Sequence, residues 1–97
     1  MSKGYWIVSI TITGDAAYKQ YFAANAAIFE KWRGRFIIRG GPYETVEGKS
    51  GERNVVIEFE SYQQALACYS SPEYQAILPH LRAGASIAYF TIVEGAP

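Results

Sequence analysis

The sequence has few side chains that could hold a metal ion or form a disulfide bond. Cys68 is the only cysteine and His80 the only histidine among 97 residues. One cysteine excludes a disulfide within the chain and is typical of a reducing compartment. We therefore expect a cytoplasmic protein without a metal site in the single chain. Cys68 is interpreted as a small core residue and His80 as a solvent-facing or C-capping residue near a helix end.

Several other features are absent. Nine basic residues balance nine acidic ones, so we expect no nucleic-acid partner and no binding to an anionic membrane. No apolar run approaches the ~20 residues needed to span a bilayer, and the N-terminus lacks the apolar core of a signal peptide. No nucleotide-binding, hydrolase or metalloprotease motif occurs, and the sequence therefore predicts no cofactor.

Aromatic residues are plentiful. Eight tyrosines, five phenylalanines and two tryptophans occur in a chain of which 49% is hydrophobic. This length and composition predict a single folded domain spanning residues 1–97. The rings could fill a core, a subunit interface or a ligand pocket.

Alternating and helical patterns divide the chain into short elements. A helix is expected to begin at Asp15 as N-cap and to end at Gly34 as a left-handed C-cap. A second helix begins at a capping box on Ser61, a further piece restarts with Ser71 as cap, and Pro79 should end or kink that piece. The segments with strand alternation are 5–13, 35–39, 43–47, 53–61 and 86–93. One face of the first helix is expected to hold Tyr18, Tyr21, Phe22, Asn25, Phe29 and Trp32.

Segments 35–39 and 43–47 are taken as one strand that Gly40-Gly41-Pro42 interrupts, so the order of the elements is β-α-β-β-α-β. It predicts an α+β fold of the ferredoxin-like kind, with one antiparallel four-stranded sheet and helices on one face. Gly40-Gly41 is interpreted as a bulge, and residues 48–51 as a hairpin turn into the third strand.

Strand parity predicts two apolar faces on this sheet. The helices should cover Trp6, Val8, Ile10, Phe36, Ile38, Val55, Ile57, Phe59, Phe90 and Ile92. The other face should carry Tyr5, Ile7, Ser9, Thr11, Ile37, Arg39, Val56, Glu58, Ile87, Tyr89, Thr91 and Val93. A solvated face would be mostly polar, so we predict a homodimer formed through this second face.

Arg39 and Glu58 are the candidate catalytic residues, because parity places both on the open face. As a structural pair they would fix the register of a dimer. As a functional pair, Arg39 would hold an anionic or carbonyl oxygen while Glu58 accepts a proton. The candidate ligand-binding residues are Ser9, Arg53, Tyr69, Tyr74 and Tyr89.

Several short motifs occur in an order that resembles a known family. They are Arg39-Gly-Gly41, Glu47-Gly48, residues 53–59 with Ser61, residues 69–75, Arg82 and Val93-Glu-Gly95. Together they resemble the domain of unknown function 1330, a family of the dimeric α/β-barrel superfamily. The resemblance implies a ferredoxin-like fold whose sheets face each other across a dimer.

Two functions from different classes stay open. Related dimeric α/β-barrel proteins include cofactor-independent monooxygenases and isomerases with pockets between sheet and helices. By that analogy the protein would bind or transform a small organic acid or carbonyl compound. The alternative is a non-catalytic dimer module whose interior is filled by its own rings. A cavity of about 300 Å³ or more touching Arg39 or Glu58 would favour the first function, and a closed, ring-filled interior the second.

Overall fold

The fold is seen in a computed structural model that describes residues 2–82 and 86–97. Along the chain the elements follow the order β-α-β-β-α-α-β. They are β1 (Gly4–Ile12), α1 (Asp15–Lys31), β2 (Arg35–Arg39), β3 (Arg53–Phe59), α2 (Tyr62–Ser70), α3 (Pro72–Arg82) and β4 (Ser86–Glu94). This order confirms the predicted ferredoxin-like fold, with the second helical region divided in two.

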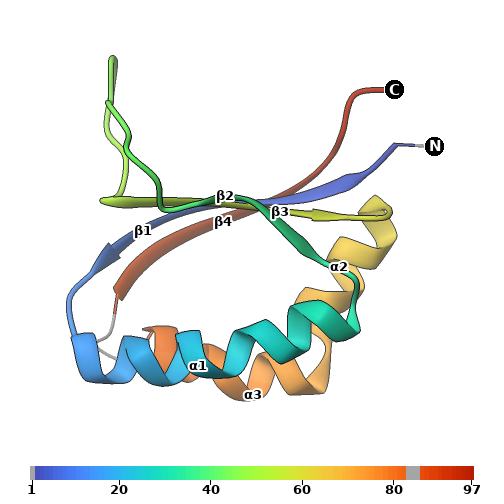
Figure 1. The fold of residues 1–97 in the computed structure, drawn as a ribbon, viewed down its shortest axis with the longest axis horizontal. Helices are drawn as coiled ribbons and strands as arrows, with labels where there is room; N and C mark the ends of the chain where they lie inside the picture. The colour runs from blue at the N-terminus through green and yellow to red at the C-terminus, as the bar shows by residue number, and fades with distance from the viewer. Residues whose placement is uncertain (1, 83–85) are drawn as a thin grey trace.

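The strands form one antiparallel sheet in the order β2-β3-β1-β4. All three helices lie against one face of this sheet, and no other described element covers the opposite face (Figure 1). The segment 40–52 rises from the open side, and both chain ends leave the sheet on that side (Figure 1). Because β2 and β4 are free edges, the sheet does not close within one chain.

The core lies between the sheet and the helices, where strand alternation places it. Trp6 and Val8 point to this face and are buried. The Trp6 ring centroid lies 5.1 Å from that of Phe29 and 4.9 Å from that of Tyr74. The indole Nε1 donates a hydrogen bond of 2.9 Å to the carbonyl oxygen of Ala65. Many of the aromatic residues are therefore core residues.

Both ends of α1 differ from the sequence prediction by one residue. Gly14 is the N-cap, and Asp15 is instead the first helical residue. A carboxylate at that position interacts favourably with the helix dipole and stabilises the helix. At the other end, the left-handed φ of 60° belongs to Arg33 and not to Gly34. Gly34 has a different role, because a Cβ there would lie 2.9 Å from the ring of Phe59.

The predicted caps of α2 and α3 are confirmed. Ser61 Oγ accepts a hydrogen bond of 3.0 Å from the backbone N–H of Gln64. Ser71 Oγ accepts one of 3.3 Å from the N–H of Tyr74. Pro79 lies inside α3 and does not end it.

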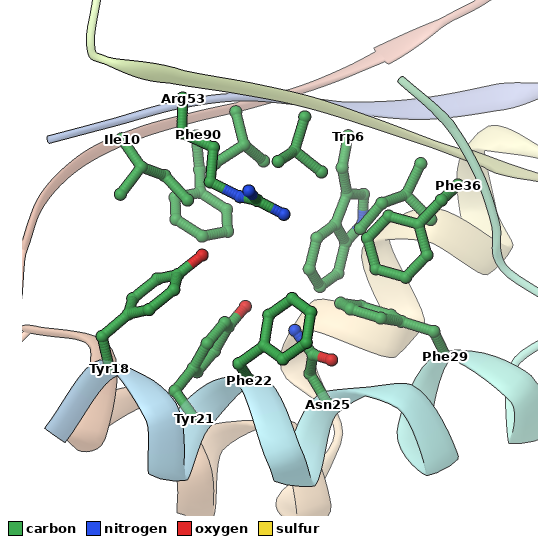
Figure 2. A pocket seen from close by; sticks show the side chains of 13 residues that line it. Trp6, Ile10, Tyr18, Tyr21, Phe22, Asn25, Phe29, Phe36, Arg53 and Phe90 are labelled. Atoms are coloured by element: carbon green, nitrogen blue, oxygen red, sulfur yellow. The ribbon is translucent and has the colours of Figure 1, made fainter. Parts of the chain in front are cut away.

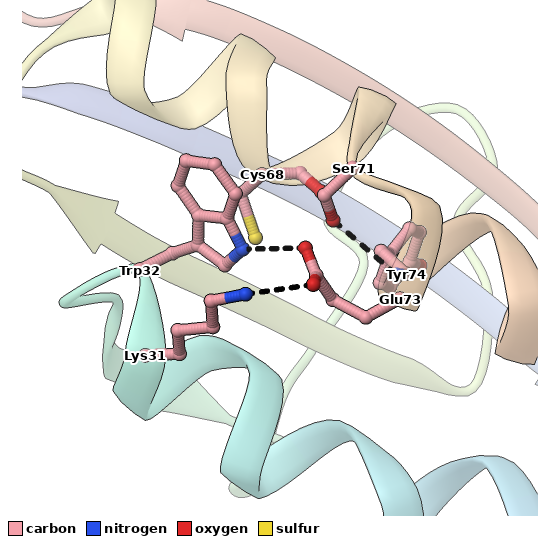
Figure 3. Close-up of polar contacts among 6 residues, drawn as sticks. All are labelled: Lys31, Trp32, Cys68, Ser71, Glu73 and Tyr74. Atoms are coloured by element: carbon pink, nitrogen blue, oxygen red, sulfur yellow. Dashed lines mark hydrogen bonds and ion pairs between the residues drawn. The ribbon is translucent and has the colours of Figure 1, made fainter.

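Polar contacts fasten the start of α3 to the end of α1. The Glu73 carboxylate accepts hydrogen bonds from Lys31 Nζ at 2.8 Å and from Trp32 Nε1 at 3.2 Å (Figure 3). The hydrogen bond from Lys31 is the main reason that the pKa of Glu73 lies below its usual value. These contacts hold α3 beside α1, and the next residue, Tyr74, is buried in the same core as Cys68.

The segment 40–52 between β2 and β3 is an exposed loop. The predicted strand at 43–47 is wrong, and residues 48–51 therefore do not join two paired strands. The base of the loop is anchored, because the backbone N–H of Gly51 donates a hydrogen bond of 2.6 Å to Ser9 Oγ. A Cβ at Gly51 would lie 2.6 Å from the Ile10 backbone, so this close approach requires glycine.

Strand β2 contains one residue more than its partner segment. The register against β3 shifts by one between Phe36 and Ile38, which leaves Ile37 as an extra, bulged residue. The bulge predicted at Gly40-Gly41 is therefore wrong in position.

The bulge reverses the side on which the last residues of β2 lie. Ile38 pairs with Val56 and is exposed on the open face, although parity predicts it in the core. Arg39 pairs with Val55, whose side chain is in the core. The prediction of Arg39 on the open face is wrong for the same reason.

Candidate functional site

A small internal cavity lies between α1 and the helix-covered face of the sheet. Its volume is about 20 Å³, enough for one water molecule. Most of its wall is aromatic (Figure 2). The rings around it include Trp6, Tyr18, Tyr21, Phe22, Phe29 and Phe36. The small volume of this closed interior favours the non-catalytic alternative. The polar groups in its wall must therefore decide between the two functions.

Among the described residues that line this cavity, Arg53 alone has a charged side chain. It is the first residue of β3 and pairs with Ile10, so its side chain leaves the sheet on the helix side. The guanidinium group points into the cavity (Figure 2), and the buried Nε has no hydrogen-bond partner. Gly40, with a φ of 70°, leaves room for this side chain, since a Cβ there would collide with Arg53 Nη1.

Asn25 faces the same cavity from α1. The residue is buried, and its Oδ1 also lacks a hydrogen-bond partner. Each buried polar group without a partner costs about 1–3 kcal/mol. The two such side-chain atoms found in the described residues, one donor and one acceptor, therefore belong to residues that line one cavity.

Tyrosine hydroxyls form a second polar group beside Asn25. Tyr21 Oη lies 2.8 Å from Tyr74 Oη in a buried hydrogen bond. Burial raises the pKa of Tyr21 to about 12, and burial also raises the pKa of Tyr74. Both hydroxyls are consequently neutral at ordinary pH and can donate or accept a hydrogen bond but not act as strong bases.

A larger, open hollow of about 480 Å³ adjoins this cavity at the start of α1. Tyr18, Phe22 and Arg53 line both spaces, so Arg53 is reached from outside past the Phe22 ring. Lys19 and Asp15 complete the charged rim of the hollow. We call this hollow, together with the cavity, the Arg53 site.

The structure separates the predicted catalytic pair. Glu58 lies on the open face, where its carboxylate accepts hydrogen bonds from Tyr5 Oη at 3.0 Å and Arg35 Nη2 at 2.9 Å. The hydrogen bond from Tyr5, together with the charge of Arg35, lowers the pKa of Glu58, which makes it a weak base. Arg39 lies on the other side of the sheet, with its Cζ 4.2 Å from the Phe36 ring centroid.

The other predicted ligand-binding residues fall into separate places. Tyr74 is fully buried, and Tyr69 packs on Trp6 with ring centroids 5.8 Å apart. Ser9 and Tyr89 instead line an open hollow of about 520 Å³ on the open face. Of the candidate catalytic and ligand-binding residues, Arg53 alone lines the internal cavity.

Cys68 and His80 have the places expected of them. Cys68 is fully buried in the core, and burial raises the pKa of its thiol to about 12. Such a thiol is a poor nucleophile near neutral pH. His80 is exposed near the end of α3.

The family model described as Domain of unknown function (DUF1330) matches residues 3–96. The chain belongs to this family. Among proteins of curated function, none matches it in sequence. None of the described helices of this DUF1330 protein is long and apolar enough to cross a membrane.

Solved structures with this fold have little sequence identity to the DUF1330 chain. A protein of unknown function from Rhodopseudomonas palustris has a TM-score of 0.77 at 14% identity, covering 99% of this chain and 84% of its own. The cofactor-independent oxygenase SnoaB from Streptomyces nogalater has a TM-score of 0.67 at 19% identity, with coverages of 100% and 96%. A dimeric ferredoxin-like protein of unknown function from Thermobifida fusca has a TM-score of 0.55 at 10% identity, with coverages of 95% and 90%.

Sequence reasoning placed Asn25 on the right helix face but gave it no role. The available signal was a polar residue in an apolar stripe, between Tyr21 and Phe29 at four-residue steps. Phe22 was likewise expected only to pack. Its position at the mouth of the Arg53 site depends on how α1 lies across the sheet, which no local pattern encodes.

Proposed function

We propose that this DUF1330 protein binds a small organic acid or carbonyl compound at the Arg53 site. One observation carries the proposal: Arg53 Nε and Asn25 Oδ1 are buried and unpaired, and both residues line the same cavity. Buried polar groups in native proteins nearly always have a partner. A ligand with an acceptor oxygen and a neighbouring donor would satisfy both atoms.

The chemistry of binding follows from the wall. The Arg53 guanidinium donates charge-assisted hydrogen bonds to a carboxylate or a polarised carbonyl oxygen. Asn25 Oδ1 accepts a hydrogen bond from an O–H or N–H of the ligand. Since the cavity holds only about 20 Å³, the ligand's oxygen end enters it while the carbon skeleton lies in the outer hollow.

An enzymatic conversion is the more specific form of this proposal. SnoaB, with 100% of this chain covered in the comparison, is described as an oxygenase that needs no cofactor. That likeness concerns the fold alone and assigns neither a site nor a reaction to this chain. In such a reaction Arg53 would stabilise negative charge on the ligand oxygen.

A non-catalytic dimer module is the competing function. The observation in its favour is the ring-lined interior, whose free volume is that of one water molecule. In that case a bound water satisfies both Arg53 Nε and Asn25 Oδ1, and no ligand binds. A titration separates the two functions.

The test is isothermal titration of the protein with benzoate, pyruvate and acetoacetate, together with a thermal-shift screen of the same compounds. We expect at least one of them to bind and to raise the melting temperature. Arg53→Gln should weaken that binding at least tenfold, whereas Arg33→Gln, on an exposed arginine paired with Glu60, should not. Unchanged binding in Arg53→Gln contradicts the proposal, and so does failure of all these probes together with the diacids and monoamides named below.

The open face supports a second part of the proposal, a homodimer formed through this face. Ile7, Ile37, Ile38 and Ile87 are all exposed there. Four strands of five to nine residues, at about 3.3 Å per residue and about 4.8 Å apart, give a footprint of roughly 500 Å². A stable interface buries about 800 Å² per subunit, and the exposed loop 40–52 on the same side would supply the rest. One of the similar structures is described as dimeric.

Light scattering after size exclusion tests this assembly. We expect a dimer at micromolar concentration for the wild type and a monomer for Ile7→Asp, which buries a charge in the proposed interface. Leu66→Asp, a matched change on the exposed surface of α2, should leave the dimer intact. A monomeric wild type contradicts the dimer. A cytoplasmic location stays a prediction from the sequence.

A further inference from the structure

Two arginines from different strands meet one phenylalanine at the mouth of the Arg53 site. The Cζ of Arg39 lies 5.2 Å from the centroid of the Phe22 ring, and that of Arg53 lies 5.8 Å from it. Phe22 is 38% exposed and lines both the cavity and the outer hollow. The bulge in β2 creates this arrangement, because it places Arg39 on the helix side of the sheet.

Neither of these guanidinium groups has an acidic partner within residues 2–82 and 86–97. The ion pairs in that part of the chain join Lys31 to Glu73, Arg33 to Glu60 and Arg35 to Glu58. Lys19 adds a third cation at the mouth, and Asp15 is the only carboxylate among the described residues that line the outer hollow. The mouth therefore carries an excess of positive charge in a chain whose formal net charge is zero.

Cation–π contacts with the Phe22 ring leave N–H donors of both guanidinium groups unused. Arg39 is exposed and stacks on Phe22 and Phe36, and a stacked guanidinium keeps its N–H groups at the ring edge free to bind an anion. Arg53 has its Nε inside the cavity without a partner. The two groups thus present donors at an inner and an outer position around one ring.

We infer that the ligand of the Arg53 site is a small dicarboxylate, or a similar dianion, with one acidic group on Arg53 and the other on Arg39. This inference rests on the proposed function, because it names the class of compound bound there. Both guanidinium carbons lie within 6 Å of one ring centroid. Their distances of 5.2 and 5.8 Å from that centroid place the two Cζ atoms at most about 11 Å apart, and a chain of about four to six carbons with a carboxylate at each end reaches both. Each guanidinium can hold its carboxylate through two parallel hydrogen bonds.

Matched pairs of probes test the inference in titrations at fixed ionic strength. The pairs are succinate with its monoamide and glutarate with its monoamide, which differ in one charge and hardly in shape. For the wild type we expect the dianion of a pair to bind roughly tenfold more tightly than the monoamide. Arg39→Gln should remove this preference and keep the monoamide affinity, whereas Arg53→Gln should weaken both probes. Arg39→Lys, which keeps the charge, should keep part of the preference.

Arg33→Gln is the control for general charge, and circular dichroism checks the folding of each variant. Equal binding of dianion and monoamide to the wild type overturns the inference and leaves the proposed function standing. A preference that survives in Arg39→Gln, or that Arg33→Gln removes equally, also overturns it. If the wild type binds none of these acids and none of the single acids above, the proposed function itself fails.

Discussion

The two faces of the sheet are built from alternate residues of the same strands, yet they are completed in different ways. In β1, Trp6 is 1% exposed under the helices, while the next residue, Ile7, is 48% exposed on the open face. Both residues are apolar, so hydrophobicity alone does not decide which face the chain covers. The short connections through α1 and through α2 with α3 decide it, because they place every helix on one side.

The polar groups on the two faces show the reverse difference. On the open face, Glu58 is satisfied by Tyr5 and Arg35. On the covered face, Arg53 and Asn25 each leave a buried atom without a partner. The covered face is thus closed in shape but leaves two buried polar atoms unpaired, whereas the polar groups of Glu58 on the open face are paired and the area around them is apolar and exposed. A small polar ligand suits the first, and a second protein surface suits the second.

Removing one large side chain from each face should separate them most clearly. Trp6→Ala leaves a cavity among the core rings and removes the hydrogen bond to Ala65, so we expect a loss of about 3–5 kcal/mol in the free energy of unfolding. Tyr89→Ala removes a ring that is 72% exposed and should change the free energy of unfolding of the monomer by about 0.5 kcal/mol or less. Urea unfolding at low protein concentration measures both. Similar losses would show that the faces do not differ as described.

Alkaline pH should act on the covered face. Burial raises the pKa of Tyr21 to about 12 from its ordinary value of 10.0, so the unfolded chain releases this proton first. The stability that the neutral hydroxyl contributes is complete below pH 10 and is lost as the pH rises toward 12, by about 2–3 kcal/mol. Thermal melts between pH 9 and 12 measure it.

Tyr21→Phe is the matched variant for that experiment. The substitution should lower stability at pH 8, because Tyr74 loses its hydrogen-bond partner. Above pH 10, the stability of the variant should fall less steeply than that of the wild type. A wild-type melting temperature that stays flat up to pH 12, or a slope that is the same in both proteins, would contradict the account.

Two glycines of the 40–52 loop sharpen the comparison at the edge of the open face. Gly51→Ala places a Cβ against the Ile10 backbone and should cost about 1–3 kcal/mol. Gly41 has nothing within 4 Å of an added Cβ, so Gly41→Ala should change stability by less than about 1 kcal/mol. Chemical denaturation of the two variants checks the difference, and equal effects would mean that the loop base is not packed on β1.

Glu58→Gln should have the smallest effect, and none at the Arg53 site. The hydrogen bond from Tyr5 lowers the pKa of Glu58, so its contribution to stability is present above the unfolded pKa and fades as the pH falls through the folded one. The difference in melting temperature between wild type and variant should therefore shrink from pH 7 to pH 3. Carboxylate binding should stay within about twofold, and a larger loss would return Glu58 to the site.

Sequence patterns were reliable where alternation was unbroken. Trp6, Val8 and Ile57 lie on the predicted face because β1 and β3 pair without a shift. Parity was wrong for Ile38 and Arg39, because the bulge falls at Ile37, where no glycine or proline marks it. Because of that single inserted residue, Arg39 and Glu58 lie on opposite sides of the sheet and do not form the predicted pair.

The Arg53 site was harder to predict than the fold. Arg53 was among the predicted ligand-binding residues, but its unpaired Nε depends on the positions of α1 and Gly40 relative to β3. Asn25 belongs to a helix face whose spacing is visible in the sequence, yet spacing does not show whether its amide finds a partner. Whether a buried polar group finds a hydrogen-bond partner depends on tertiary packing, and local patterns in a single sequence do not show it.

A crystal structure of the protein soaked with glutarate tests the central claim most directly. The account predicts a carboxylate of the ligand within hydrogen-bonding distance of Arg53 Nε, on the helix-covered side of the sheet, with Phe22 beside it. A structure with the ligand on the open face near Tyr89, or with one water molecule bridging Arg53 and Asn25 and no ligand at saturating concentration, would contradict it.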